Sequence, residues 1–309
     1  MILPMTDTIH VFDRALLRRR RDRAAAGLRA HDFLFAEAAE RLADRLDDVT
    51  RKFPRALDLG CHDGTLSRVL AGRGGIETLV QCDLSPAMAR AAATNGAPTL
   101  AADEEALPFA PESFDLIVSV LGLHWVNDLP GALIQIRRAL KPDGLFLGAL
   151  LGGATLTELR TALIEAELAE EGGASPRVAP FAELRDAGGL LQRAGFALPV
   201  ADADRIAVSY PDALALMREL RAMGESNTLR ARRRGFTRRA TLLRAAAIYG
   251  EKFADPDGRV RASFEIVTLT GWAPHPCQPQ ALAPGSATTR LADALGTEER
   301  PAGDKARPK

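Results

Sequence analysis

Three acidic residues and a glycine-rich turn have the types and spacing of a ligand site. The segment Ala56-Leu-Asp-Leu-Gly-Cys-His-Asp-Gly-Thr-Leu66 contains Asp58, Gly60 and Gly64. Asp83 ends the next apolar run, and Asp103 follows the third. Glycines in such a turn let the backbone approach a ligand closely, and ligands of parallel sheets bind at the carboxyl edge of the strands. We therefore expect these residues to share one site.

The three acids also predict which ligand binds. A carboxylate at Asp58 suits a cationic amino group, one at Asp83 suits both hydroxyls of a ribose, and one at Asp103 suits an adenine amino group. Taken alone, the turn could be structural, Asp83 could cap a helix, and Asp103 could be a solvated loop acid. Together they match S-adenosylmethionine. They fit a dinucleotide less well, because that ligand would place a pyrophosphate at the helix N-terminus. The predicted cofactor-binding residues are Asp58, Gly60, Gly64, Asp83, Leu84, Asp103 and Glu104, and no metal site is predicted.

The candidate catalytic residues lie further along the chain. Methyl transfer is an in-line displacement on an activated sulfonium, so positioning can supply much of it without a dedicated base. His124 and Trp125 follow the fourth apolar run, where a histidine could orient a nucleophile or take its proton. The alternative is a buried pair that packs the next loop. Glu225 could meet a guanidinium or an acyl substrate, or it could belong to a turn that ends a helix.

Alternating apolar runs and helical segments must position these residues. Such β-α alternation predicts a parallel sheet with helices on both faces. The predicted strands are Ala56–Leu59, Thr78–Asp83, Thr99–Ala102, Phe114–Val120, Leu145–Leu151, Arg205–Ser209 and Phe264–Trp272. The predicted helices include Leu66–Ala71, Pro86–Thr94, Pro130–Leu140, Thr155–Ala169 and Phe181–Ala194.

Composition shifts divide the chain into three parts. We expect an N-terminal helical segment over residues 1–54, a cofactor-binding domain over 55–273 and a poorly ordered tail over 274–309. The two late strands bracket a helical, strongly basic insertion, residues 211–255. This insertion would lie over the mouth of the sheet.

We expect the insertion to act as a lid that excludes water from the site. Gly224 and Gly235 are its candidate hinges. We also expect an acidic mouth that admits a protein chain, because glutamates follow the fifth strand at positions 158, 165, 167, 170 and 171.

Composition and charge exclude several classes of protein. Lys plus Arg and Asp plus Glu both number 40, which argues against a protein that coats nucleic acid. No apolar run approaches the ~20 residues that span a bilayer, and the N-terminus lacks the apolar core of a signal peptide. Three cysteines without Cys-x-x-Cys spacing are typical of a reduced compartment. We expect a cytoplasmic protein, with peripheral association at the inner face of the membrane left open.

The motif set resembles that of the class I S-adenosylmethionine-dependent methyltransferases. The resemblance rests on Asp58-Leu-Gly60, Asp83, Ala102-Asp-Glu-Glu-Ala-Leu-Pro-Phe109, Ser113-Phe-Asp-Leu-Ile117 and Leu140-Lys-Pro-Asp-Gly144. It implies an α/β, Rossmann-like fold with a seven-stranded sheet, N-terminal helices and a helical lid insertion. One position departs from the pattern, since His62 stands where the turn usually has its middle glycine. That side chain either points away from the ligand or lines its pocket.

Further segments resemble the mitochondrial complex I assembly factor 5 family and its bacterial relatives. They are Ile9-His-Val-Phe-Asp-Arg14, Leu123-His-Trp-Val-Asn-Asp-Leu-Pro130, Gly152-Gly-Ala-Thr-Leu-Thr-Glu-Leu159, Met223-Gly-Glu-Ser-Asn227 and Gly285-Ser-Ala-Thr288. This resemblance implies hydroxylation of an arginine on a quinone-site subunit of complex I. The five histidines include no His-x-Asp or His-x-Glu pair, the common spacing of a facial iron triad.

Three functions therefore compete. The first is an arginine-modifying assembly factor for respiratory complex I, with a protein substrate. The second is a carboxyl methyltransferase for a small acid or an acyl-carrier-protein thioester, since the malonyl-acyl-carrier-protein methyltransferases share the Leu-His-Trp segment and the Lys-Pro-Asp-Gly turn. The third is a non-catalytic scaffold that binds S-adenosylmethionine.

Overall fold

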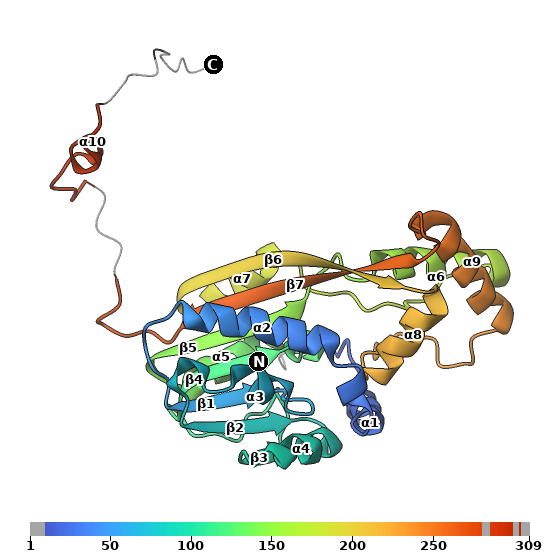
Figure 1. Ribbon diagram of the computed structural model, residues 1–309, viewed down its shortest axis with the longest axis horizontal. Coiled ribbons are helices and arrows are strands. Elements are labelled where there is room, and N and C mark those ends of the chain that lie inside the picture. Colours follow the sequence, from blue (N-terminus) through green and yellow to red (C-terminus); the bar gives the residue numbers. More distant parts are fainter. Residues whose placement is uncertain (1–9, 280–284, 299–302, 304–309) are drawn as a thin grey trace, which may run out of the picture. The chain divides into compact units, whose positions relative to one another are not determined.

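One mixed sheet organises the protein (Figure 1). The computed structural model describes residues 10–279, 285–298 and 303. Seven strands lie in the order β3-β2-β1-β4-β5-β7-β6. The first five are parallel, whereas β7 pairs antiparallel with both β5 and β6. The strands are β1 (Arg55–Leu59), β2 (Thr78–Asp83), β3 (Thr99–Ala101), β4 (Phe114–Val120), β5 (Leu140–Leu151), β6 (Ala197–Tyr210) and β7 (Val260–Trp272).

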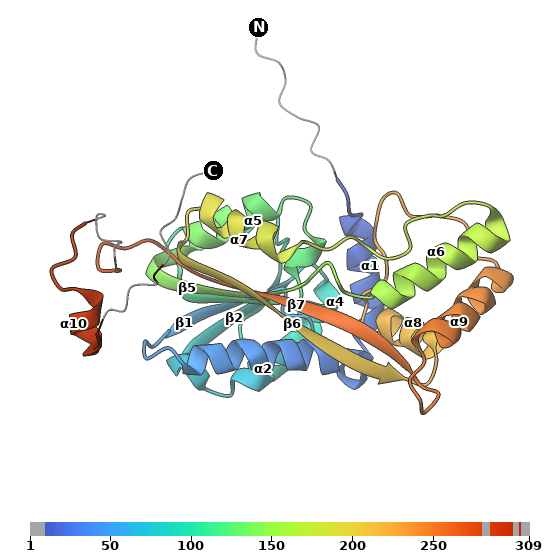
Figure 2. The same cartoon turned by 90° about the horizontal axis from the view of Figure 1, so that it is seen from above.

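Helices cover both faces of the sheet, which confirms the predicted α/β class (Figure 2). One face carries α2 (Phe33–Asp47) and α3 (Thr65–Leu70), and the other carries α5 (Leu129–Ala139) and α7 (Leu184–Arg193). Strand β4 is buried on both faces, so its residues enter two different cores. Leu116, Val118 and Val120 pack with α2, whereas Phe114 and Ile117 pack with α5. A continuous apolar run is the sequence pattern of such a doubly covered strand.

Strand β6 is longer than the sequence pattern predicts. The pattern predicts a strand over 205–209, but β6 runs from Ala197 to Tyr210 and pairs with β7 almost throughout. Its first half, Ala-Leu-Pro-Val-Ala-Asp-Ala-Asp, contains few β-branched residues and is only half-buried, because β6 is an edge strand. Hydrogen bonding to β7, and not the β-propensity of its residues, therefore determines that this segment is a strand.

The insertion between β6 and β7 lies beyond the carboxyl end of β5. Leu151, the last residue of β5, pairs with Ile266, so the start of β7 and the end of β6 run past the parallel strands (Figure 1). This extension carries α8 (Ala213–Ala222) and α9 (Arg239–Phe253), and α9 packs along α6 (Thr157–Glu171). The insertion therefore stands at the edge of the sheet where the predicted cofactor acids lie.

The N-terminal helix α1 (Arg14–Ala24) links this edge to the insertion. The Asp13 N–H donates to the Thr228 carbonyl oxygen over 2.8 Å, just beyond α8. On the other side, Ser85 Oγ at the start of α4 (Pro86–Ala92) lies 2.6 Å from Asp22 Oδ1. Helix α1 is therefore held both by the cofactor-domain sheet and by the insertion.

The chain divides into two compact units, residues 1–274 and 275–309. The described part of the second unit contains one short helix, α10 (Leu291–Leu295). Ile9 and most of the last ten residues lie outside the described residues. None of the helices in the described ranges is both long and apolar enough to cross a bilayer. The predicted domain limits and the poorly ordered tail stay predictions.

Candidate cofactor and substrate site

The turn between β1 and α3 has the backbone conformation that a close approach to a ligand requires. Gly60 and Gly64 adopt positive φ angles of 75° and 82°, which glycine tolerates without steric cost. A Cβ at Gly60 would lie 3.5 Å from Glu104 Oε1, and one at Gly64 would lie 3.0 Å from Asn95 Nδ2. Both positions therefore favour glycine by conformation, and Gly64 also by space.

His62 lies in the same turn with its side chain buried. It also adopts a positive φ, of 50°, and its ring packs on Phe35 of α2 with 4.3 Å between ring centroids. Its Nε2 donates to the Val120 carbonyl oxygen over 3.1 Å. Burial, together with the charge of Arg21, lowers the pKa of His62, so the ring is neutral at pH 7. The side chain thus faces the core while its backbone N–H donates to Asp83 Oδ2 over 3.1 Å.

Asp58 is a buried carboxyl group without a partner. It lies near the end of β1, fully buried, and neither of its oxygens accepts a hydrogen bond from the described residues. Burial, with Asp83 and Asp63 nearby, raises the pKa of Asp58 well above its usual value. An unpaired buried carboxyl is costly. A cationic ligand group placed here would relieve that cost, so the structure fits the amino group that the sequence assigns to this residue.

Asp83 ends β2 beside the same turn. Its Oδ1 accepts from the Ser85 N–H over 2.7 Å, and Ser85, not Asp83, caps α4 through Met88 N–H. Asp83 is therefore not the cap of this helix, and its carboxylate faces the turn. The neighbouring Leu84 packs in a small apolar cluster with Trp125 and Phe12.

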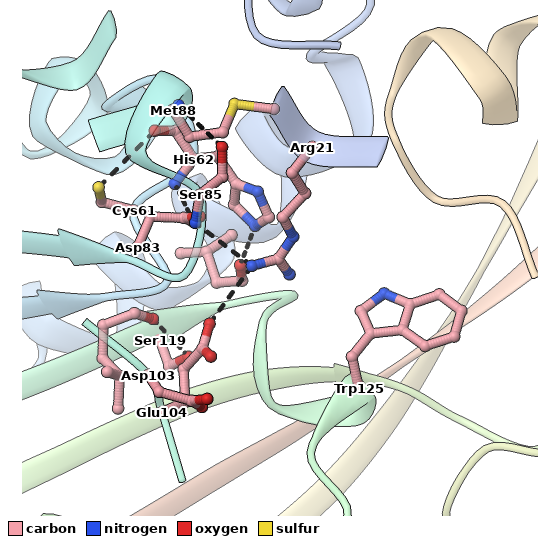
Figure 3. A network of polar contacts seen from close by, with 12 residues as sticks. Arg21, Cys61, His62, Asp83, Ser85, Met88, Asp103, Glu104, Ser119 and Trp125 are labelled. Atoms are coloured by element: carbon pink, nitrogen blue, oxygen red, sulfur yellow. Dashed lines mark hydrogen bonds and ion pairs between the residues drawn. The ribbon is translucent and has the colours of Figure 1, made fainter. Parts of the chain in front are cut away.

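Two arginines of α1 contact acids at the ends of β2 and β3. Figure 3 shows one of them, Arg21, beside Asp83 and Glu104. Arg14 donates to Asp103 Oδ1 over 2.6 Å and also to Glu104 Oε2. Arg21 is completely buried, and its Nη1 lies 3.4 Å from Asp83 Oδ2 and 3.3 Å from Glu104 Oε1. Neither arginine is among the site residues predicted from the sequence. Helical spacing could have indicated that Arg21 is buried, because Leu17, Arg21 and Ala24 share one face of α1.

The three candidate catalytic residues come together although 100 residues of sequence separate Trp125 from Glu225. His124 and Trp125 form a single helical turn, η4 (Leu123–Trp125), after β4, and Glu225 follows α8. Trp125 Nε1 donates to Glu225 Oε2 over 2.6 Å, and His124 Nε2 donates to the same oxygen over 3.1 Å. Burial raises the pKa of Glu225, but the bond and charge of His124, with the charge of Arg21, lower it overall. Glu225 is therefore a buried carboxylate.

An apolar pocket of about 160 Å³ adjoins this cluster. Its walls come from η4, α6, α8 and the loop before α7, so the insertion forms one side of it. Glu225 Oε1 has no hydrogen-bond partner among the described residues. The pocket is lined by Trp125, Leu156, Leu159, Leu163, Arg177, Val178, Ala179, Phe181, Met217, Leu220, Glu225, Ser226 and Asn227.

The glutamates of α6 do not form the acidic mouth that the sequence suggested. Glu158 is buried and accepts from Ser263 Oγ over 2.5 Å, and Glu165 pairs with Lys252 of α9. Glu167 and Glu171 pair with Arg177 and Arg233. These acids are therefore engaged by partners within the chain, one of which, Lys252, belongs to α9. In the described parts of the chain, no group of three His, Cys, Asp or Glu side chains could hold a metal ion.

Comparison with known proteins identifies the family. Residues 57–148 match the methyltransferase domain family. The chain is 44% identical over 289 residues to the mitochondrial arginine-hydroxylase NDUFAF5 of Danio rerio, covering 92% of this chain and 89% of the relative. The chain belongs to the NDUFAF5 family. It is 34% identical to the malonyl-[acyl-carrier protein] O-methyltransferase of a Methylovorus species, covering 88% of this chain and 93% of that one.

A solved structure supports the fold of this NDUFAF5-family chain. The YcgJ protein of Bacillus subtilis superposes with a TM-score of 0.53 at 14% identity, covering 76% of this chain and 98% of that one. With the methyltransferase domain match, this confirms the predicted fold. The name of the Danio rerio relative places that protein in mitochondria. The chain is accordingly a methyltransferase-like enzyme, as predicted.

Proposed function

We propose that this chain binds S-adenosylmethionine at the ends of β1, β2 and β3, and that it hydroxylates an arginine side chain of a protein substrate. The cofactor assignment is supported by the methyltransferase domain match and by the fit of the residues present. Asp58 is a buried, unpartnered carboxyl that suits an ammonium group, and Asp83 and Asp103 suit a ribose and an adenine. When bound, this cofactor would carry an activated methyl group on sulfur, which the hydroxylation itself does not consume.

The observation that carries the substrate assignment is Glu225. One oxygen is held by His124 and Trp125, and the other has no partner among the described residues. Glu225 is also one of the residues that line an apolar pocket. A guanidinium pairs with a carboxylate through a planar, charge-assisted fork, and apolar walls suit the methylene stem of an arginine. The name of the NDUFAF5 relatives supports the same chemistry.

The described residues contribute binding and orientation to this reaction. Hydroxylation replaces a carbon-bound hydrogen by a hydroxyl group, so it consumes an oxidant. With dioxygen as the oxidant, the second oxygen atom leaves as water after uptake of two electrons and two protons from a reductant co-substrate. Glu225 holds the guanidinium, His124 and Trp125 fix the carboxylate, and the apolar walls exclude water.

The partner we propose is a quinone-site subunit of respiratory complex I, and the place of action is the cytoplasm or the inner face of the membrane. Whole-chain resemblance to the NDUFAF5 family supports this partner. The lid role of the insertion also stands as a proposal. It is supported by the position of Glu225 at the end of α8, which brings an insertion residue to the site.

Mass spectrometry of complex I subunits tests the proposed activity. Subunits from a strain that expresses the wild-type chain should contain an arginine heavier by one oxygen atom. A strain with Glu225→Gln should lack that arginine, because the guanidinium loses its carboxylate. Glu170→Gln is the matched control, since Glu170 is exposed on α6. Its subunits should match wild type.

The second candidate is a carboxyl methyltransferase of an acyl-carrier-protein thioester. The 34% identity to a malonyl-[acyl-carrier protein] O-methyltransferase favours it. A deletion strain that loses a methyl ester, with complex I arginines unchanged, would select this function. A strain that loses neither product would leave the non-catalytic scaffold.

A further inference from the structure

Arg21 is a buried cation whose hydrogen-bonding capacity is largely unused. Its side chain is inaccessible to solvent, and only Nη1 has partners, at 3.3 Å and 3.4 Å. Nε and Nη2 have none among the described residues. These two nitrogens lie on the same edge of the guanidinium, where their N–H groups form a fork that matches both oxygens of a carboxylate. An unused fork in a buried site indicates that a ligand supplies the acceptor.

The acids near Arg21 are already engaged by other groups. Asp83 accepts from the backbone N–H groups of His62 and Ser85. Glu104 accepts from Arg14. Ribose hydroxyls at Asp83 would compete with Nη1 of Arg21 for the Oδ2 atom. With the nucleoside part of the cofactor bound, Arg21 would lose part of its contact with Asp83. A second anion beside its guanidinium would then replace that contact.

We propose that Arg21 binds the α-carboxylate of the amino-acid portion of S-adenosylmethionine and of its demethylated product. The inference rests on the proposed cofactor and adds a residue that recognises its carboxylate. Arg21 and Asp58 then offer one positive and one negative group to a ligand that carries a carboxylate and an ammonium group. Helix α1 supplies the positive group, so cofactor recognition includes the N-terminal segment as well as the strand ends.

A pair of ligands that differ only in the carboxylate tests this role. S-adenosylhomocysteine carries the carboxylate, and its decarboxylated analogue keeps the amine, thioether, ribose and adenine. Calorimetry on the wild-type chain should show about 10- to 100-fold tighter binding of S-adenosylhomocysteine, the range of charge-assisted bonds. In Arg21→Met this preference should fall to about twofold or less.

Two further variants keep the test sharp. Arg21→Lys retains the charge without the fork and should keep only part of the preference. Arg23→Met removes an exposed arginine from the same helix and should keep all of it. Because the readout is a ratio measured within one variant, a general loss of affinity cancels. If Arg21→Met does not fold, the ratio in Arg21→Lys decides.

Each contrary outcome has a distinct meaning. A preference that survives in Arg21→Met overturns the role of Arg21. Equal binding of both ligands by wild type overturns it too and leaves the cofactor assignment standing. Tighter binding of both ligands by Arg21→Met, with the ratio unchanged, would show that Arg21 only competes with ribose at Asp83. Wild-type protein that is folded but binds neither ligand sinks both the cofactor and this role.

Discussion

At the residue scale, the buried Asp58 carboxyl has no partner among the described residues, which is costly for the free protein. We propose that the ammonium group of the ligand relieves this cost. Its pKa is raised above the ordinary 3.8 by burial and by Asp83 and Asp63. The folded state therefore binds a proton more tightly than the unfolded state, and stability falls as pH rises from about 3.8 through the folded-state pKa. Asp58→Asn should remove this dependence, so its melting temperature should exceed that of wild type increasingly at higher pH.

The same variant should lose ligand recognition. A neutral amide at this position cannot form an ion pair with an ammonium group, so S-adenosylhomocysteine should stabilise Asp58→Asn much less than wild type at pH 7. Thermal melts at several pH values, with and without ligand, measure both effects. Asp44→Asn, an exposed change on α2, should alter neither the pH dependence of the melting temperature nor the stabilisation by ligand. A pH dependence shared by wild type and Asp58→Asn would mean that Asp58 does not titrate abnormally.

Asp83 should contribute to the binding affinity of every ligand that contains ribose. Asp83→Ala should weaken binding by about 1.5–3 kcal/mol, the range of charge-assisted hydrogen bonds. Unlike the Arg21 change, it should weaken S-adenosylhomocysteine and its decarboxylated analogue equally. Calorimetry with both ligands measures this. Unchanged affinity would reduce Asp83 to a support for the turn through Ser85 and His62.

At the element scale, there is a physical reason why the sequence pattern indicates the acids and not the arginines as candidate site residues. Parallel strands end at one edge, so an acid at the end of each strand can be assigned to one site without knowledge of packing. Arg21 stands in the run Arg18 to Arg21, and such a run by itself indicates a solvated helix face. Arg18 and Arg19 are exposed, but packing against the sheet edge buries Arg21. Tertiary contacts, not composition, separate these neighbours.

Glycine at the end of α8 joins the insertion to α1. Gly224 has a φ of 81°, and a Cβ there would lie 3.3 Å from Ala24 Cβ and 3.6 Å from Arg21 Cα. Gly224→Ala should therefore destabilise the fold by about 1–2 kcal/mol, because a left-handed alanine is strained and crowded. Gly235→Ala, at an exposed glycine outside the left-handed region, should be within about 0.5 kcal/mol of wild type. Urea titration of both variants measures this difference, and equal stabilities would contradict it.

The lid proposal concerns the whole insertion. If residues 211–255 close over the bound ligand, their amides should exchange more slowly when S-adenosylhomocysteine is present. The effect should be largest around Glu225 and smaller in α9, which already packs against α6. Hydrogen exchange followed by mass spectrometry gives this profile. Equal protection with and without ligand would exclude a lid.

At the scale of the whole molecule, charge is balanced overall but unevenly placed. The glutamates of α6 are largely paired within the chain, whereas a cavity of about 680 Å³ between α1 and α8 is lined by Arg20, Arg23, Arg218 and Arg221. Burial and the charges of Arg232 and Arg23 lower the pKa of Arg20, as expected where positive charges repel. Ser226 lines both this cavity and the apolar pocket beside Glu225. We propose that a substrate entering the pocket passes this basic surface.

This arrangement predicts how a protein substrate is recruited. Acidic residues near the modified arginine would meet the basic cavity, so Arg218→Glu with Arg221→Glu should raise the KM for the protein substrate about tenfold at low salt. The effect should shrink as salt rises, because both arginines are exposed and screened. Binding of S-adenosylhomocysteine should not change, since neither arginine contacts the cofactor acids. Arg244→Glu, an exposed change on α9, is the control for charge reversal and should leave KM near wild type. If the double variant and this control behave alike at low salt, the basic cavity does not receive the substrate, and recruitment depends on the apolar pocket alone.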